Sequence, residues 1–306
     1  MVGSQAAKPL SAIAPGRFAH FLGIDWSGAA GSRHPGIALA LCSAAGGTPR
    51  LVERAPWSRE AVLDYLRHEL PANTLIGMDL GMALPHDDAG AYFPGLADGP
   101  DDARGLWRLV DETCANDADL GVSAFVDDSR FAPFFRRHGG REGAHFHLRT
   151  SEHGRGRFRV TERAQEALGC KPYSNFNLVG AAQVGKASLS GMRLLHRLDG
   201  AIPVWPFDPL PATGSVIVEI YSAIAAMAAG RSASRSKIRT SADLDTALAA
   251  LDSQASGLSG EIDDHRADAM IIAAWLRTAA SKARLWHPAT MTHAIARTEG
   301  WTFGAP

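Results

Sequence analysis

The sequence has few cysteines and no long apolar run. Its 306 residues include three cysteines, Cys42, Cys114 and Cys170, and no two of them form a CxxC pair. Both a disulfide framework and a cysteine zinc site are therefore excluded. No stretch of 18 uncharged apolar residues could span a membrane, and residues 1–17 contain no apolar signal-peptide core. These absences predict a cytoplasmic protein with reduced thiols and no membrane partner.

The chain also lacks an excess of charge of either sign. It has 31 basic and 32 acidic residues, which gives a formal net charge of -1. A nucleic-acid partner could not be attracted by a global positive field and would need a local basic patch. The chain contains no internal repeat, and its 46% hydrophobic content is that of an ordinary globular protein. Its length is sufficient to bury a sizeable core.

Alternating apolar and polar segments predict an α/β domain with a mixed sheet. Residues 1–18 are expected to form a loose tail, and residues 19–306 a single domain. Residues 86–212 are rich in Gly, Asp, Arg, His and Pro, and they read as a long insertion that contains one firm helix. Period-2 and period-3.6 patterns predict strands at 21–26, 36–44, 50–57, 73–85 and 214–223, and helices at 58–70, 180–198, 241–255 and 263–280.

Acidic residues interrupt several of the apolar runs. Asp25 follows FLGI, Asp79 lies within LIGMDLGMAL, and Glu219 lies within VIVEIYSA. In DDHRADA, Asp264 and Asp268 are four residues apart, so a helix would place them on one face. Taken singly, each of these acids could be a helix cap or a salt-bridge partner. Together they predict a shared site, because several carboxylates in apolar surroundings repel one another unless a cation joins them.

A carboxylate cluster of this kind is typical of a site for Mg²⁺ or Mn²⁺. Two such ions about 3.5–4 Å apart can hold the attacking and leaving oxygens of a phosphodiester. Adjacent strands lie roughly 4.8 Å apart, so acids on neighbouring strands could reach one metal. The residues predicted to hold the metal are Asp25, Asp79, Asp264, His265 and Asp268, and those predicted to act in catalysis are Asp25, Asp79, Glu219, His265 and Asp268.

The order of these segments resembles the ribonuclease-H-like fold. More closely, the chain resembles the domain-of-unknown-function family numbered 429, described as predicted ribonuclease-H-like nucleases. Its HRADAMIIA segment resembles a motif of RuvC-type junction resolvases. Ser222 stands where that family has proline. The resemblance implies a five-stranded sheet of order 3-2-1-4-5, with Asp25, Asp79 and Asp268 as the site acids. The segments that carry it are GIDWSG, GMDLGMALP, NFNLVGAAQVGKASLSGMRLL, VWPFD, VEIYSA, DDHRADA and EGWTFG.

Basic residues of the insertion are the predicted substrate contacts. Residues 136–163 contain eight arginines against three glutamates, with Phe146 and Phe158 available for base stacking. We expect this segment to flank the acidic site as a mobile loop. The alternatives are a solvated loop and a contact between two copies of the chain in a homodimer. The predicted phosphate contacts are Arg155, Arg157, Arg159, Lys186 and Arg193.

These patterns favour a metal-dependent nuclease that hydrolyses phosphodiester bonds. Two alternatives stay open. One is a non-catalytic binding protein in which the acids only support the fold. The other is an actin-like phosphotransferase, which shares the strand order but needs two copies of the fold and a second glycine-rich phosphate loop, and this sequence has neither.

Overall fold

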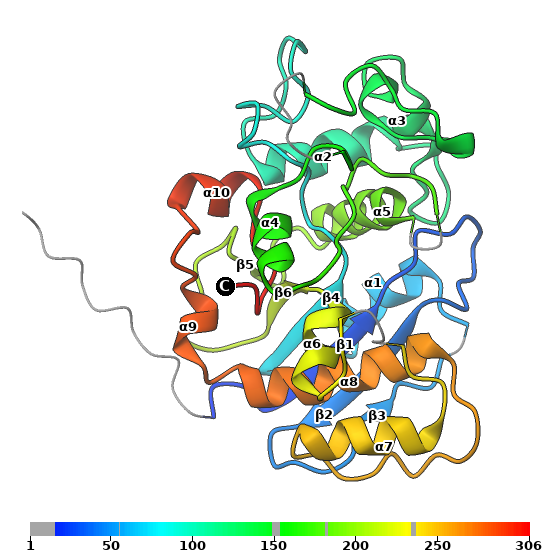
Figure 1. Ribbon diagram of the computed structural model, residues 1–306, viewed down its shortest axis with the longest axis vertical. Helices are drawn as coiled ribbons and strands as arrows, with labels where there is room; N and C mark the ends of the chain where they lie inside the picture. The colour runs from blue at the N-terminus through cyan, green and yellow to red at the C-terminus, as the bar shows by residue number, and fades with distance from the viewer. Residues whose placement is uncertain (1–15, 55, 149–153, 181–182, 234–236) are drawn as a thin grey trace, which may run out of the picture.

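A mixed six-stranded sheet forms the centre of the protein (Figure 1). The computed structural model describes residues 16–54, 56–148, 154–180, 183–233 and 237–306. Within these ranges the strand order is β3-β2-β1-β4-β6-β5. The strands are β1 His20–Asp25, β2 Ala38–Ser43, β3 Arg50–Leu51, β4 Thr74–Asp79, β5 Val204–Trp205 and β6 Val216–Ile220.

The strand directions divide the sheet into two parts. Strand β2 is antiparallel to both β1 and β3, whereas β4, β6 and β5 run parallel to β1. The α/β class, the mixed sheet and the relative order of the five expected strands are confirmed. The prediction of five strands was wrong, because β5 adds a short edge strand from within the insertion. A two-residue strand of this kind carries almost no periodicity in sequence.

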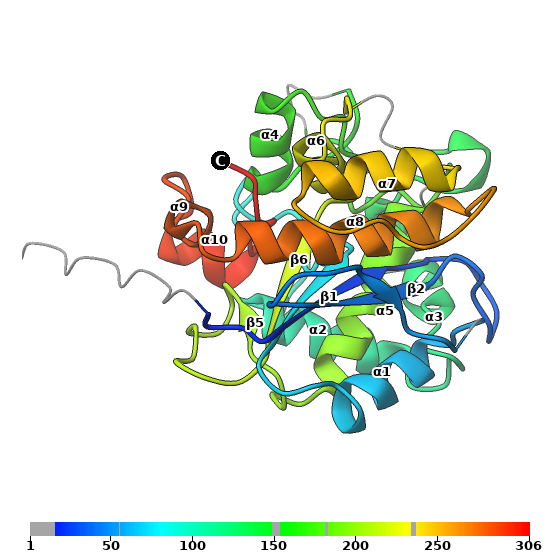
Figure 2. The same ribbon diagram turned by 90° about the horizontal axis from the view of Figure 1, so that it is seen from below.

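Helices cover both faces of the sheet (Figure 2). Helices α6, α7 and α8 lie on one face, and α1, α2 and α5 lie on the other. The N-terminal caps of four of these helices are side chains that the sequence pattern favours, since Ser58, Asp102, Thr240 and Asp263 each accept a hydrogen bond from a first-turn amide. The helix bounds are α1 Arg59–His68, α2 Ala103–Thr113, α5 Val184–Arg197, α6 Ser222–Ala228, α7 Ser241–Ala250 and α8 Asp264–Ala279.

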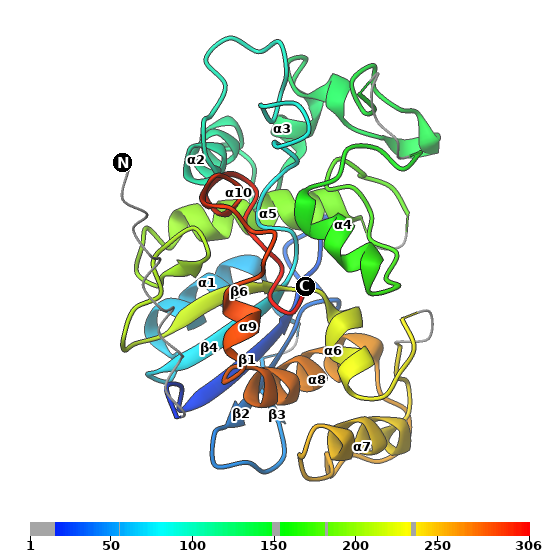
Figure 3. The same cartoon turned by 60° about the vertical axis from the view of Figure 1, so that its left-hand side comes forward.

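The expected insertion gathers beside the sheet, at the end of the molecule away from α7 (Figure 3). Besides α2, α5 and β5, it contains α3 Ser123–Asp127, two 3₁₀ turns and α4 Val160–Ala167. The 3₁₀ turns are η1 Ala132–Phe134 and η2 His138–Gly140. Two short helices, α9 Ala283–Trp286 and α10 His293–Thr298, follow α8. Across the described ranges, the structure shows no helix of the length and apolarity needed to cross a bilayer.

The sheet separates two apolar cores, as the alternation of its side chains requires. Leu22 and Ile24 of β1 face the core shared with α1, α2 and α5, whereas Phe21 faces the core shared with α6, α7 and α8. The expected loose tail ends earlier than predicted. Phe18 is buried and stacks on Trp286 with ring centroids 6.2 Å apart. Residues 1–15 of that tail lie outside the described ranges.

Two glycines bring α8 unusually close to the sheet. A Cβ atom on Gly23 of β1 would lie 2.2 Å from the Ala269 carbonyl oxygen, and one on Gly77 of β4 would lie 2.9 Å from a Leu276 methyl. Gly23 and Asp25 are two residues apart, so they share the face of the sheet that contacts α8. The absence of a side chain at Gly23 therefore sets how near the first turns of α8 come to Asp25.

We predict that Gly23→Ala destabilises the fold. The added methyl group would overlap the Ala269 carbonyl and the Ala273 amide, and overpacking of this kind costs about 1–3 kcal/mol. Gly99→Ala is the matched control, since its nearest contact would be an ordinary 3.7 Å. Urea unfolding should show a lower midpoint for Gly23→Ala alone, and equal midpoints for both variants would contradict the packing account.

Candidate active site at the carboxyl ends of the parallel strands

The first two acids of the site lie side by side at the ends of neighbouring strands. Asp25 is the last residue of β1, Asp79 is the last residue of β4, and the two are direct partners in the parallel register. Paired residues on parallel strands point to the same face of the sheet. Ligands of open α/β sheets bind outside the carboxyl ends of the strands, which is where this pair lies.

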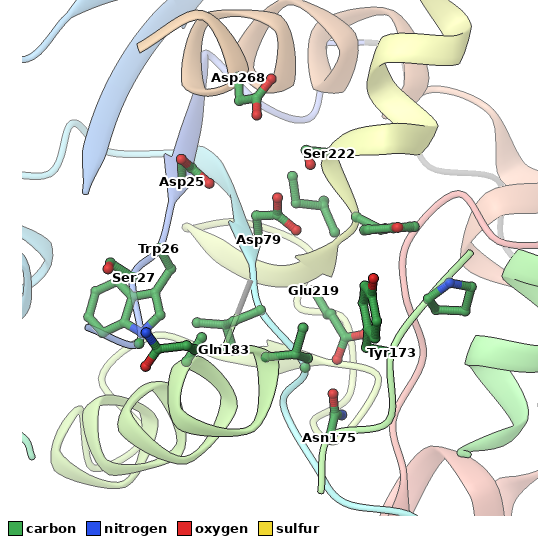
Figure 4. Close-up of a pocket in the computed structure, with 18 of the residues that line it drawn as sticks. Asp25, Trp26, Ser27, Asp79, Tyr173, Asn175, Gln183, Glu219, Ser222 and Asp268 are labelled. Carbon is green, nitrogen blue, oxygen red and sulfur yellow. The ribbon is translucent and has the colours of Figure 1, made fainter. Parts of the chain in front are cut away.

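The third acid comes from α8, which crosses this face of the sheet. Asp263 caps the helix by accepting a hydrogen bond from the Arg266 amide at 2.9 Å. Asp268 therefore lies in the second turn, on a helix that Gly23 allows to approach. Figure 4 shows the carboxyl groups of Asp25, Asp79 and Asp268 facing a common space. The predicted convergence of the three acids from distant parts of the sequence is present in the structure.

The three carboxyl groups resist ionisation together. Burial and the neighbouring charge of Asp25 raise the pKa of Asp79 to about 7. Burial, Asp25 and Asp79 raise the pKa of Asp268 to about 8. Burial also raises the pKa of Asp25, although its hydrogen bond with His265 opposes the rise. Burial in a low-dielectric site, reinforced by neighbouring acids, produces shifts of this kind.

Two side chains from the rim contact this cluster. His265 Nδ1 donates to Asp25 Oδ2 at 2.6 Å, and that hydrogen bond raises the pKa of the imidazole. Gly36 makes room for the ring, because a Cβ there would be 3.3 Å from it. Asp264 forms an ion pair with Lys237, which lowers the pKa of Asp264. The first turn of α8 thus supplies the imidazole that binds Asp25 and the carboxylate that holds Lys237.

Ser222 is a site residue that sequence reasoning did not assign. It begins α6 directly after β6, and hydrogen bonds from its hydroxyl and its backbone amide act to lower the pKa of Asp79. Proline at this position could supply neither donor. The serine therefore gives this chain two groups that orient Asp79 and partly offset its burial.

The acids line one end of a cavity of about 360 Å³. This volume is within the range of small-ligand sites. At the other end lie Pro172, Tyr173 and Asn175, and its floor contains Arg159 and Glu219. Figure 4 shows Glu219, Tyr173 and Asn175 grouped away from Asp268. The cavity therefore joins an acidic region to an aromatic and amide region.

Glu219 lines the same cavity as the other acids, as predicted, but its carboxylate has separate partners. In the register it pairs with Met78, so it points to the face of the sheet opposite Asp25 and Asp79. Its oxygens accept from Arg159 at 2.6 and 2.8 Å and from the Met82 amide at 2.7 Å. These partners give Glu219 a structural role, and the sequence could not show the register with β4 that places it on the opposite face from Asp79.

Three of the predicted phosphate contacts are internal. Arg157 is buried, with an ion pair to Asp88 at 2.6 Å and hydrogen bonds to backbone carbonyls. Arg193 is buried beside Asp111 at 2.8 Å. Arg159 is buried between Glu162 and Glu219. These guanidinium groups stabilise the fold of the insertion, so the expectation that they bind substrate does not fit their placement.

The remaining basic residues are nearer the surface. Arg155 pairs with Glu166 and donates to the Pro172 carbonyl at 3.0 Å, so it anchors the segment before Tyr173. Lys186 lines a second cavity of about 490 Å³ that shares Gly28 and Ala29 with the first. Phe146 and Phe158, expected to stack on bases, are buried. Residues 149–153 of the predicted loop lie outside the described ranges.

Sequence reasoning missed Lys237, Tyr173 and Asn175 as well as Ser222. Lys237 follows a polar segment, SRS, and Tyr173 follows a cysteine, a lysine and a proline, with no periodic signal around either. Only the NFN motif that includes Asn175 drew notice, through the family resemblance. These residues reach the cavity from loops, whose positions depend on tertiary contacts.

The side chains at the acidic end of the cavity offer the type of ligand atom that a hard divalent cation prefers. Asp25, Asp79 and Asp268 offer carboxylate oxygens, which Mg²⁺ and Mn²⁺ prefer. Within the described ranges, no three His, Cys, Asp or Glu side chains form a ready-made metal group. Magnesium commonly takes one or two carboxylates and completes its shell with water and substrate phosphate oxygens.

Comparisons with protein-family models, with curated proteins and with solved structures each found no match to this chain. The resemblance to the ribonuclease-H-like family therefore stays a prediction.

We predict that Asp268→Asn stabilises the metal-free protein more at pH 8.5 than at pH 5.5. The pKa of Asp268 is about 8 in the folded state and about 3.9 when unfolded. At pH values between these two pKa values, Asp268 is protonated in the folded state and ionised in the unfolded state. The free energy of unfolding therefore falls as pH rises, by at most about 1.4 kcal/mol per pH unit. Because an asparagine side chain does not ionise, the variant does not lose stability in this way as pH rises. Thermal unfolding in EDTA should show a pH-dependent gain that the exposed control Asp101→Asn lacks.

We also predict that Arg159→Met strongly destabilises the fold. The change leaves Glu162 and Glu219 buried without their shared cation, and breaking a buried ion pair from one side costs about 3–5 kcal/mol. Arg155→Met is the control, because its ion pair is partly exposed and is worth less than about 1 kcal/mol. A phosphate contact at Arg159 would instead leave the unfolding midpoint in urea unchanged.

Proposed function

We propose that this protein is a divalent-metal-dependent phosphodiester hydrolase with a ribonuclease-H-like arrangement. The observation that carries the proposal is the in-register pair Asp25 and Asp79, faced by Asp268 from α8. Three neighbouring carboxyl groups have raised pKa values, chiefly because they are buried and, for Asp79 and Asp268, also because of the neighbouring acids. This arrangement favours a site built for a cation. If these acids served only as helix caps, burying them next to one another would cost free energy without stabilising the fold.

Asp25, Asp79 and Asp268 would hold the Mg²⁺ or Mn²⁺ ion. When bound, the metal would activate water and stabilise charge on the phosphoryl oxygens. Asp264 and His265, also predicted as ligands, have other partners in the structure, since Asp264 binds Lys237 and His265 Nδ1 binds Asp25. They therefore support the site from its rim.

The chain's own groups fix the acids and supply charge at the mouth. His265 orients Asp25 through the 2.6 Å hydrogen bond, and Ser222 orients Asp79. Lys237 lines the cavity and lies near Asp25 and Asp268, so its ammonium group can attract a phosphate to an otherwise acidic site. The apolar wall formed by Leu80 and Ile220 reduces access of bulk water and strengthens these interactions.

Nucleic acid is the proposed class of substrate, because it supplies the phosphodiester bonds that such a site would hydrolyse. Basic residues placed to contact it include Lys237 in this cavity and Lys186, Arg137 and Arg141 in the adjoining one. Neither the composition nor the buried arginines provide a broad cationic surface. Substrate is therefore selected at the cavity itself.

We predict that Asp25→Asn and Asp79→Asn each lower metal-dependent hydrolysis by about a hundredfold or more, as expected when a group that stabilises transition-state charge is removed. The measurement is cleavage of single-stranded DNA, single-stranded RNA, duplexes and bis(p-nitrophenyl) phosphate with Mg²⁺ and with Mn²⁺. Asp101→Asn should cleave like the wild type. Equal rates for all three variants, or no cleavage of any substrate by the wild type with either metal, would count against the proposal.

A further inference from the structure

We infer that the cavity binds a single unpaired nucleotide unit, with its base stacked on Tyr173 and its phosphate at the acidic end. This inference rests on the proposed function, and it specifies the substrate of the same site. The unit can be a free nucleotide or the unpaired end of a strand, since both present the same base and phosphate.

Tyr173 is unusual among the apolar side chains of this protein. Among the described residues, only Tyr173 and Leu258 are large apolar side chains classed as exposed, at 52% and 41%. Tyr173 lines the wall of the cavity that contains the three acids. Burying an aromatic ring is favourable. An exposed ring in the wall of a cavity therefore indicates that a ligand covers it when bound.

The segment that carries Tyr173 is held rigidly from both sides. Arg155 donates to the Pro172 carbonyl at 3.0 Å. Ser174 Oγ donates to the Arg157 carbonyl at 2.6 Å, and Asn175 Nδ2 donates to the Ala83 carbonyl at 2.8 Å. A platform fixed in this way loses little conformational freedom when a ligand stacks on it. The arginine expected to contact phosphate therefore supports the aromatic platform instead.

A second aromatic side chain, Tyr221, lines the cavity close to Tyr173. Tyr221 follows β6 and also lies near Asp79. The path from the Tyr173 wall to the acids thus passes an aromatic ring and the Ile220 side chain. A nucleotide has matching chemistry, with a flat apolar base at one end and an anionic phosphate at the other.

The dimensions of the cavity argue against a stacked duplex. Its volume of about 360 Å³ is at the small end of ligand sites, and Asp25, which lines it, is only 8% exposed. A base pair within a helix cannot reach a buried carboxylate unless the nucleotide leaves the stack. An unpaired nucleotide has no such requirement.

The test is isothermal titration calorimetry on the full chain with three probes, each with Mn²⁺. The probes are thymidine 5′-monophosphate, a short oligothymidylate and a blunt-ended DNA hairpin with a fully paired stem. Tyr173→Ala should weaken binding of the first two by about tenfold or more, as alanine substitution does at other base-stacking aromatics. Tyr173→Phe should retain their affinity, and Leu258→Ala is the matched control for loss of an exposed apolar side chain.

The probe pattern identifies the source of the nucleotide. Binding of the monophosphate as tight as that of the oligothymidylate indicates a free nucleotide, and tighter binding of the oligothymidylate indicates a strand end. Unchanged affinity in Tyr173→Ala, or hairpin binding as tight as that of the oligothymidylate, would overturn the inference. Failure of the proposed function is distinct, because it would leave Tyr173-dependent binding without any Asp25-dependent hydrolysis.

Discussion

The close approach of α8 to β1 is the constraint on which the site depends. Gly23 has no side chain, and the Ala269 carbonyl occupies the space where a Cβ would be. This contact brings Asp268 over Asp25 and Asp79, whose register is already fixed by parallel pairing. The repulsion among the three carboxyl groups is a cost of this packing, and the apolar contacts of α8 with both strands offset it.

A second charged network keeps the insertion in place without entering the chemistry. Arg159 bridges Glu162 of α4 and Glu219 of β6, and it donates to the Glu299 carbonyl at 2.9 Å. Residues far apart in the sequence are joined at one buried guanidinium. Because the bidentate geometry of arginine suits two carboxylates, this network lines one part of the cavity, while the aspartates form its acidic end.

The charged network around Arg159 and the acidic cluster around Asp268 differ in how their charges are paired. At Arg159 the opposite charges are matched and buried, which stabilises the fold only while all partners stay present. Around Asp268 several acids lie close together, and the basic partners, His265 on Asp25 and Lys237 on Asp264, lie at the rim. Unmatched charge in a cavity is a common property of functional sites, whereas matched internal charge is a property of structure.

The sequence by itself determined the element order, the main strands and helices, and the acids at the ends of β1 and β4, because periodicity and strand-end position are local properties. It also indicated Asp268, since its helical spacing from Asp264 is local. Only the tertiary structure decided that Glu219 faces away from Asp79, since the register of β6 against β4 sets its side and Arg159 pairs with it. The same holds for the buried arginines and for Tyr173 and Lys237, whose surroundings are made by segments distant in sequence.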